Sequence, residues 1–170
     1  VAALLVVILL AVRLPADEAQ RARREIGELG VRVIRLTAPP HQMLYDKDRI
    51  IVAAGKPVEL VLENSDLMPH NLVVTEAGAL EEIGLAAEAL ATQPGALERQ
   101  YVPASPKILA STRLVQPRES AKLTFTAPAR PGVYPYLCTY PGHWRRMFGA
   151  MYVVDDLEAY LAGGDAFLDA

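Results

Sequence analysis

The sequence contains very little cysteine and no excess of positive charge. Its 170 residues include one cysteine, Cys138, so no internal disulfide can form and the fold must rest on packing. The same count excludes iron–sulfur clusters, cysteine-rich zinc modules and two-cysteine redox pairs. A formal net charge of -3 gives no electrostatic reason to expect nucleic acid or an anionic membrane as a partner.

Glycine and proline are also too sparse for a fibrous or low-complexity chain, at 11 and 13 residues. Hydrophobic residues make up 52% of the sequence, which is too many for a disordered protein. The length suits one domain with a real core, or one domain plus an appendage. The composition therefore predicts a globular domain whose single thiol is free for a function.

Residues 1–29 differ from the rest of the chain and are treated as a separate N-terminal segment. Residues 1–12 are all apolar, and a helix of that length rises about 18 Å, less than the ~30 Å hydrocarbon core of a bilayer. The segment is therefore either the remnant of a signal sequence or membrane anchor, or the end of a preceding domain. A charged helix over Ala16–Leu29 is expected next, with Pro15 before it and Gly30 after it.

From Gly30 onward, short apolar runs between turn residues predict strands. Pro57–Glu63 and Ser120–Thr126 alternate apolar and polar side chains, the period of a half-buried strand. Further strands are expected at Val31–Leu36, Met43–Tyr45, Ile50–Val52, Asn71–Thr75, Gly132–Cys138 and Gly149–Val154. Tyr134, Tyr136 and Phe125 are expected in the core. The pattern indicates an all-β fold, a half-buried antiparallel sandwich over residues 30–155.

A helical insertion interrupts the strands at residues 77–117. Within it, Gly78–Ala91 places apolar residues at helical spacing, which predicts an amphipathic helix. Pro103–Pro117 is expected to be irregular chain that returns to the sandwich. Residues 156–170 form a C-terminal helical tail, with a weak helix over Asp156–Leu168.

Two short segments contain the residues with metal-binding chemistry. One includes His70, between Pro69 and Asn71, and the other begins at Cys138 and has the spacing Cys-x4-His-x3-Met, which adds His143 and Met147. A thiolate, two imidazoles and a thioether prefer copper to hard cations, and this set defines an electron-transfer copper site. A Pro-Gly turn before His143 lets the chain leave a strand at Cys138 and return to the same metal.

Each of these residues alone has a structural explanation, since a lone cysteine is usually an inert buried residue and a lone methionine usually belongs to the core. Their joint spacing has no such structural explanation. With three histidines and four methionines, a histidine at +5 and a methionine at +9 from the only cysteine arise by chance roughly 4 times in 10,000. We therefore predict one copper ion bound by His70, Cys138, His143 and Met147. A second site at His41 and Met43 would have too few ligands.

At these residues the sequence resembles the cupredoxins, and more narrowly the plastocyanin/azurin group of type 1 blue copper proteins. The resemblance covers about Val31 to Asp155. Proline before the first histidine is similar to plastocyanin, whereas the gap between His143 and Met147 and the helical flap are more like azurin or auracyanin. The resemblance implies a Greek-key β-sandwich with copper near one end, and one-electron transfer rather than catalysis. Asn71 would tie the two ligand loops together, with Thr139 as its partner.

The resemblance also implies redox proteins as partners, either haem proteins or a fused dehydrogenase-like domain, and a periplasmic or otherwise extracytoplasmic location, with anchoring through the N-terminus as one possibility. Similar modules end large bacterial electron-transfer proteins. The chain is therefore an independent electron shuttle, the electron-entry module of a multidomain oxidoreductase, or a copper carrier. A copper oxidase would need more histidines than the three present, and a Cys–His nucleophilic enzyme has no use for Met147.

Because His143 lies in a loop, its ring is expected to be the exposed edge where electrons enter or leave. The expected apolar docking patch around it consists of Met68, Pro69, Pro141, Gly142 and Trp144. Trp144 fits a place in this patch and a place in the core equally well. Arg145 and Arg146 either steer an acidic partner or flank the loop as solvated charges.

Overall fold

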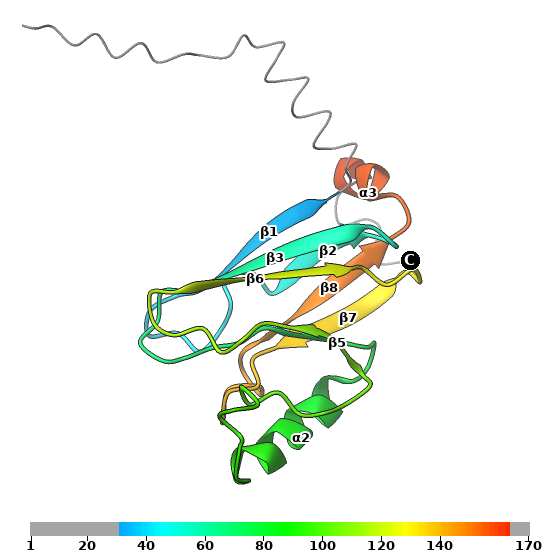
Figure 1. Cartoon of the computed structure of the whole chain (residues 1–170). Helices are drawn as coiled ribbons and strands as arrows, with labels where there is room; N and C mark the ends of the chain where they lie inside the picture. Colours follow the sequence, from blue (N-terminus) through cyan, green and yellow to red (C-terminus); the bar gives the residue numbers. More distant parts are fainter. Residues whose placement is uncertain (1–30, 164–170) are drawn as a thin grey trace, which may run out of the picture. The chain divides into compact units, whose positions relative to one another are not determined.

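The structure is a computed structural model that describes residues 31–163. The N-terminal segment, its expected charged helix and the last part of the expected tail, residues 164–170, lie outside the described residues. Within them, eight strands form two sheets (Figure 1). The first sheet has the order β1-β3-β6 and the second has the order β2-β8-β7-β4-β5.

The strand bounds agree with most of the expected ranges. The first sheet contains β1 (Arg32–Ala38), β3 (Pro57–Asn64) and β6 (Ser120–Thr126). The second contains β2 (Arg49–Ala53), β8 (Phe148–Val154), β7 (Gly132–Leu137), β4 (Val73–Thr75) and β5 (Ile108–Ser111). The expected all-β sandwich is confirmed.

Two strand pairs are parallel, which the antiparallel prediction missed. β1 runs parallel to β3, and β2 runs parallel to β8, while the other pairs are antiparallel. β1 and β2 follow each other in the chain but join different sheets, so neither forms a hairpin with its neighbour. Alternation in the sequence reports that a strand is half-buried, but it does not report the direction of the strand beside it.

The core lies between the two sheets and follows the predicted alternation. Val58, Leu60 and Leu62 of β3 are fully buried and Glu59 and Glu63 are partly exposed, whereas Val61, on the same side as the glutamates, is also buried. The second sheet contributes Tyr134, Tyr136, Met151 and Val153 to the same cluster, with Phe125 of β6 packed against it. At about 25 cal/mol per Å² of buried apolar surface, this layer is the main source of stability in a chain without a disulfide.

Two local expectations were wrong. Met43–Tyr45 is not a strand, because side-chain hydrogen bonds hold it as a loop: Asp46 accepts from the Thr37 N–H over 2.6 Å, and the Tyr45 hydroxyl donates to the Asn71 carbonyl oxygen over 2.6 Å. Conversely, the stretch expected to be irregular contains β5, which pairs with β4 at the edge of the second sheet.

The predicted helix of the insertion is confirmed as α2 (Leu80–Ala91), with Ile83, Gly84, Ala87 and Leu90 buried. A second core cluster joins it to the sheet and contains Val73, Ala79, Ile83, Leu137 and Trp144. Figure 1 shows α2 at the end of the sandwich where the loop between β7 and β8 runs. The insertion therefore lies beside the loop that contains the predicted copper residues.

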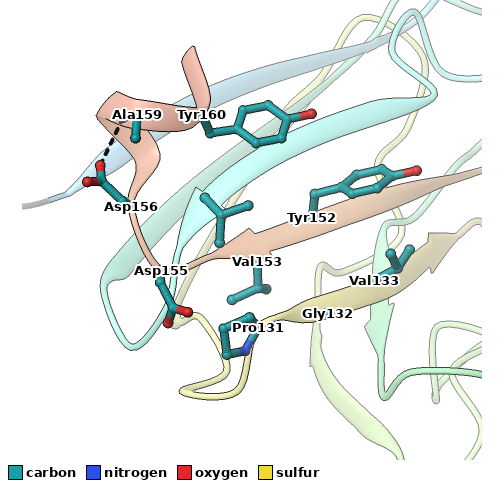
Figure 2. A pocket seen from close by; sticks show the side chains of 10 residues that line it. Pro131, Gly132, Val133, Tyr152, Val153, Asp155, Asp156, Ala159 and Tyr160 are labelled. Carbon is teal, nitrogen blue, oxygen red and sulfur yellow. Dashed lines mark hydrogen bonds between the residues drawn. The ribbon is translucent and has the colours of Figure 1, made fainter. Parts of the chain in front are cut away.

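The opposite end of the β7–β8 pair has a pocket. It is a groove of about 560 Å³ beneath α3 (Leu157–Gly163), with Gly132, Tyr152, Val153 and Tyr160 among its lining (Figure 2). Because Cys138 follows the far end of β7, this groove is not part of the predicted metal site. None of the helices in the described range combines the length and apolarity needed to cross a membrane.

Candidate metal centre

The loop between β7 and β8 brings both of its ends to one place. Cys138 directly follows β7, Met147 directly precedes β8, and the Cys138 N–H donates to the Met147 carbonyl oxygen over 2.9 Å. Inside the loop, the backbone N–H of His143 donates to the carbonyl oxygen of Tyr140, and the N–H of Met147 donates to the carbonyl oxygen of His143. These two bonds make a compact turn. Gly142 sits at φ +82°, a conformation that glycine adopts without strain.

His70 reaches the same place from the connection between β3 and β4. It forms an isolated antiparallel bridge with Val115, in which each N–H donates to the other carbonyl oxygen, over 3.1 and 2.7 Å. This bridge fixes the backbone of His70 although the residue belongs to no strand. The two segments predicted from the sequence therefore do converge.

The three strongest predicted donors lie in contact. His70 Nδ1 is 3.8 Å from Cys138 Sγ and 3.2 Å from His143 Nδ1, and Cys138 Sγ is 3.6 Å from His143 Nδ1. At most 1% of the surface of any of these residues is exposed. Met147 is fully buried in the same core cluster as Cys138.

Burial sets the protonation of this group in the metal-free protein. It raises the pKa of the Cys138 thiol to about 12, although backbone N–H groups of Asn71 and Tyr140 pull in the opposite direction. Burial lowers the pKa of His143 to about 4, and the nearby His70 lowers it further. Burial also lowers the pKa of His70. Both imidazoles are therefore neutral near pH 7, as metal binding requires, and the thiol must lose its proton when a metal binds.

The donor set fits copper. Around a first-row metal with bonds of about 2.0 Å to imidazole nitrogen and about 2.3 Å to thiolate sulfur, the donor atoms lie about 3.3–3.8 Å apart. The three separations of 3.2, 3.6 and 3.8 Å match that spacing. In residues 31–163 this is the one cluster of three or more histidine, cysteine or acidic side chains that is able to hold a metal ion. Two imidazoles with one thiolate are the ligands of electron-transfer copper.

Residues 33–154 match the family model for copper binding proteins of the plastocyanin/azurin family. The chain belongs to this family. It is 34% identical to auracyanin-A of Chloroflexus aurantiacus over 122 residues, which cover 71% of this chain and 73% of that protein. Auracyanin-B of the same organism is 28% identical over 121 residues, and the match spans half of its length.

Solved structures agree with this assignment. Auracyanin A of Chloroflexus aurantiacus, a "blue" copper protein, superposes with a TM-score of 0.65 at 33% identity, covering 74% of this chain and all of that one. The reduced auracyanin of Roseiflexus castenholzii gives a TM-score of 0.64 at 31% identity, covering 72% and 96%. This cupredoxin is thus a type 1 copper electron-transfer domain, and its cofactor is one copper ion.

Asn71 joins three segments around the site of this cupredoxin. Its side-chain Nδ2 donates to the Gln100 carbonyl oxygen and to Thr139 Oγ1, both over 2.8 Å. Its Oδ1 accepts from the Thr139 N–H over 2.8 Å. The predicted tie between the two ligand loops, with Thr139 as partner, is therefore present, and it extends to the helical insertion through Gln100.

Asp66 is a residue that the sequence reasoning missed. Its Oδ2 lies 3.1 Å from His70 Nε2, on the side of the ring that faces away from Cys138. Burial alone raises the pKa of Asp66, but hydrogen bonds from the backbone of His41 and Leu67 and from His70 outweigh it and lower the pKa to about 2. The only signal in the sequence was an acidic residue four positions before His70 in a loop, which has no specific meaning by itself.

The expectation that His143 presents an exposed edge is wrong. The residue is 1% exposed, and within the described residues its Nε2 has no hydrogen-bond partner. The ring of Tyr140 packs against His143 with centroids 4.9 Å apart, and Tyr101 of the insertion packs edge-on against Tyr140 at 5.3 Å. Tyr140 of the loop therefore packs on the imidazole, and Tyr101 of the insertion packs on Tyr140.

Trp144 belongs to the core rather than to a docking patch. It is 7% exposed, and its ring lies so close to α2 that a Cβ on Gly84 would be 2.2 Å from it. Its Nε1 donates to Glu88 Oε1 over 2.7 Å. Arg145 remains exposed, pairs with the same carboxylate at 3.0 Å and stacks over the Trp144 ring. Of the expected patch, Met68 and Gly142 are exposed, whereas Pro69 and Pro141 are half-buried.

Proposed function

We propose that His70, Cys138 and His143 hold the copper ion, with Met147 as a fourth, weaker ligand, and that the domain passes single electrons between protein partners. The observation that supports this proposal is the group of three buried donor atoms, which all lie within 4.8 Å of one another. Met147 joins the proposal because it is buried in the same cluster and its backbone closes the loop onto Cys138.

The protein's own part in electron transfer is to keep these side chains still. When bound, copper supplies the one-electron couple, and its two oxidation states prefer different geometries. The bridge at Val115, the closed turn from Cys138 to Met147 and the Asn71 hydrogen bonds fix the donors from three directions. When the ligand geometry hardly changes between the two oxidation states, less structural reorganisation opposes electron transfer. The burial of His143, which is 1% exposed, keeps its ring out of water.

We further propose that the domain catalyses no substrate turnover at the metal. Catalytic sites need an open ligand position, but the three donors are buried to at least nine-tenths and Tyr140 lies over His143. The proposed partners are redox proteins, either haem proteins or a dehydrogenase-like domain fused to it. The proposed location is periplasmic or extracytoplasmic. A relative named outer membrane protein H.8, from Neisseria meningitidis, supports that location at 30% identity over 116 residues.

Loading the protein with Cu(II) tests the ligand set. We expect intense thiolate-to-copper absorption and a narrow copper hyperfine splitting. Cys138→Ser should abolish the colour. His41→Ala should retain it, because it removes an exposed histidine side chain that is not part of the three-donor cluster. A colourless Cu(II) protein would refute the assignment. Slow electron exchange together with easy copper loss would instead indicate a copper carrier.

A further inference from the structure

A buried carboxylate stands behind one of the proposed copper ligands. Asp66 Oδ2 is 3.1 Å from His70 Nε2, and the two side chains are 10% and 1% exposed. The other nitrogen of the same ring, Nδ1, is the one that faces Cys138 and His143. The imidazole of His70 therefore lies between a carboxylate on one side and the proposed metal position on the other.

The surrounding loop holds this carboxylate in place. Asp66 Oδ1 accepts the N–H of His41 over 2.9 Å, and the Asp66 N–H donates to Asn64 Oδ1 over 3.0 Å. Asn64 in turn donates from Nδ2 to the carbonyl oxygens of Met68 and Val115, over 2.8 and 2.9 Å. Since Val115 also bridges the backbone of His70, the carboxylate and the imidazole are fixed to the same frame.

The contact with Asp66 determines which ring nitrogen of His70 has no proton and is able to bind a metal. An ionised carboxylate only accepts hydrogen bonds, so Nε2 must hold the ring proton and Nδ1 is left with its lone pair. That lone pair faces the other two donors, which is the tautomer that metal binding needs. Carboxylate partners commonly orient metal-bound histidines in this way.

We propose that Asp66 is the positioning residue for His70, and that its negative charge also lowers the reduction potential of the copper site. The proposal rests on His70 being a copper ligand. A fixed negative charge in a buried site stabilises Cu(II) more than Cu(I), because the interaction with the doubly charged ion is stronger and little water screens it. His143 has no such partner on its own Nε2 within the described residues, so Asp66 positions His70 and not His143.

Two substitutions separate the charge from the positioning. Asp66→Asn removes the charge but keeps one acceptor oxygen, and Asp66→Ala removes both. Glu63→Gln is the matched control, because it removes one negative charge from an exposed residue that pairs with Arg35. Each protein is loaded with copper, and its reduction potential and visible spectrum are measured. Asp66→Asn should lower the affinity of the site for Cu(II), relative to its affinity for Cu(I), about tenfold. A tenfold change of this ratio raises a one-electron reduction potential by about 59 mV.

Nuclear magnetic resonance of the Cu(I) protein tests the positioning directly. The His70 Nε2–H should be a slowly exchanging, downfield imidazole proton in the original protein, and it should lose that protection in Asp66→Ala. If Asp66→Asn does not fold, Asp66→Glu keeps the charge and should retain a potential close to that of the original protein.

The outcomes separate this proposal from the ligand assignment. An original protein without the blue colour would refute the ligand set itself. A blue original protein with Asp66 variants whose potentials match Glu63→Gln would leave the ligand set intact and overturn the role of Asp66. Fast exchange of the His70 Nε2–H in the unsubstituted protein would also overturn the role of Asp66.

Discussion

Replacing Asn71 with alanine is the most informative test of how the site is held together. The side chain is fully buried and takes part in three hydrogen bonds of 2.8 Å, one to Gln100 and two to Thr139. At about 1 kcal/mol for each buried hydrogen bond whose partner is left unsatisfied, Asn71→Ala should cost about 3 kcal/mol of the free energy of unfolding. For a domain of this size, that loss lowers Tm by about 10 °C.

Urea unfolding of the metal-free protein measures this loss without interference from copper. Thr139→Val is the graded control, because it removes one of the three hydrogen bonds and should cost about 1 kcal/mol. The m-value should not change in either variant, since the folded and unfolded states expose the same surface as before. The reasoning is refuted if Asn71→Ala costs no more than Thr139→Val, because the network would then contribute nothing beyond a single bond.

Two further predictions follow from the same geometry. Near pH 7–8 the Cys138 thiol is protonated, with its pKa raised to about 12. Both site imidazoles are neutral there, because burial lowers the pKa of His70 and of His143, so copper binding should release one proton. The copper affinity, measured by chelator competition, should therefore fall about tenfold for each unit of pH decrease. It should fall more steeply below about pH 4, where His143 takes up a proton. An affinity that does not change with pH would contradict this prediction. Gly84→Ala should cost about 1–3 kcal/mol of unfolding free energy by overpacking against Trp144, whereas Leu85→Ala, at an exposed position of the same helix, should change it by less than about 0.5 kcal/mol.

The position of His143 has a consequence for electron transfer by this cupredoxin. Its ring is 1% exposed and packs against Tyr140, which in turn packs against Tyr101, so a redox partner does not meet the imidazole directly. Met68 and Leu67 next to the other histidine segment are exposed, at 42% and 69%. The surface near the site thus differs from the one expected from the sequence, in which His143 itself was at the edge.

The sequence by itself predicted the ligands proposed for the site and determined the local structure on which they stand. Cys138, His143 and Met147 lie on one tight loop, which is why their spacing favours a common metal, and a single cysteine leaves few alternative roles. The period-2 segments and the helical spacing of Leu80–Ala91 also depend on neighbouring residues only, and both predictions were confirmed.

The tertiary structure alone decided how distant segments meet. The parallel pairings of β1 with β3 and of β2 with β8, the bridge of His70 to Val115, and the cover of Tyr101 over Tyr140 join residues far apart in the chain. No local period or spacing encodes such contacts. They form because the two sheets must bury their apolar faces against each other while the backbone groups of each strand and bridge find hydrogen-bond partners.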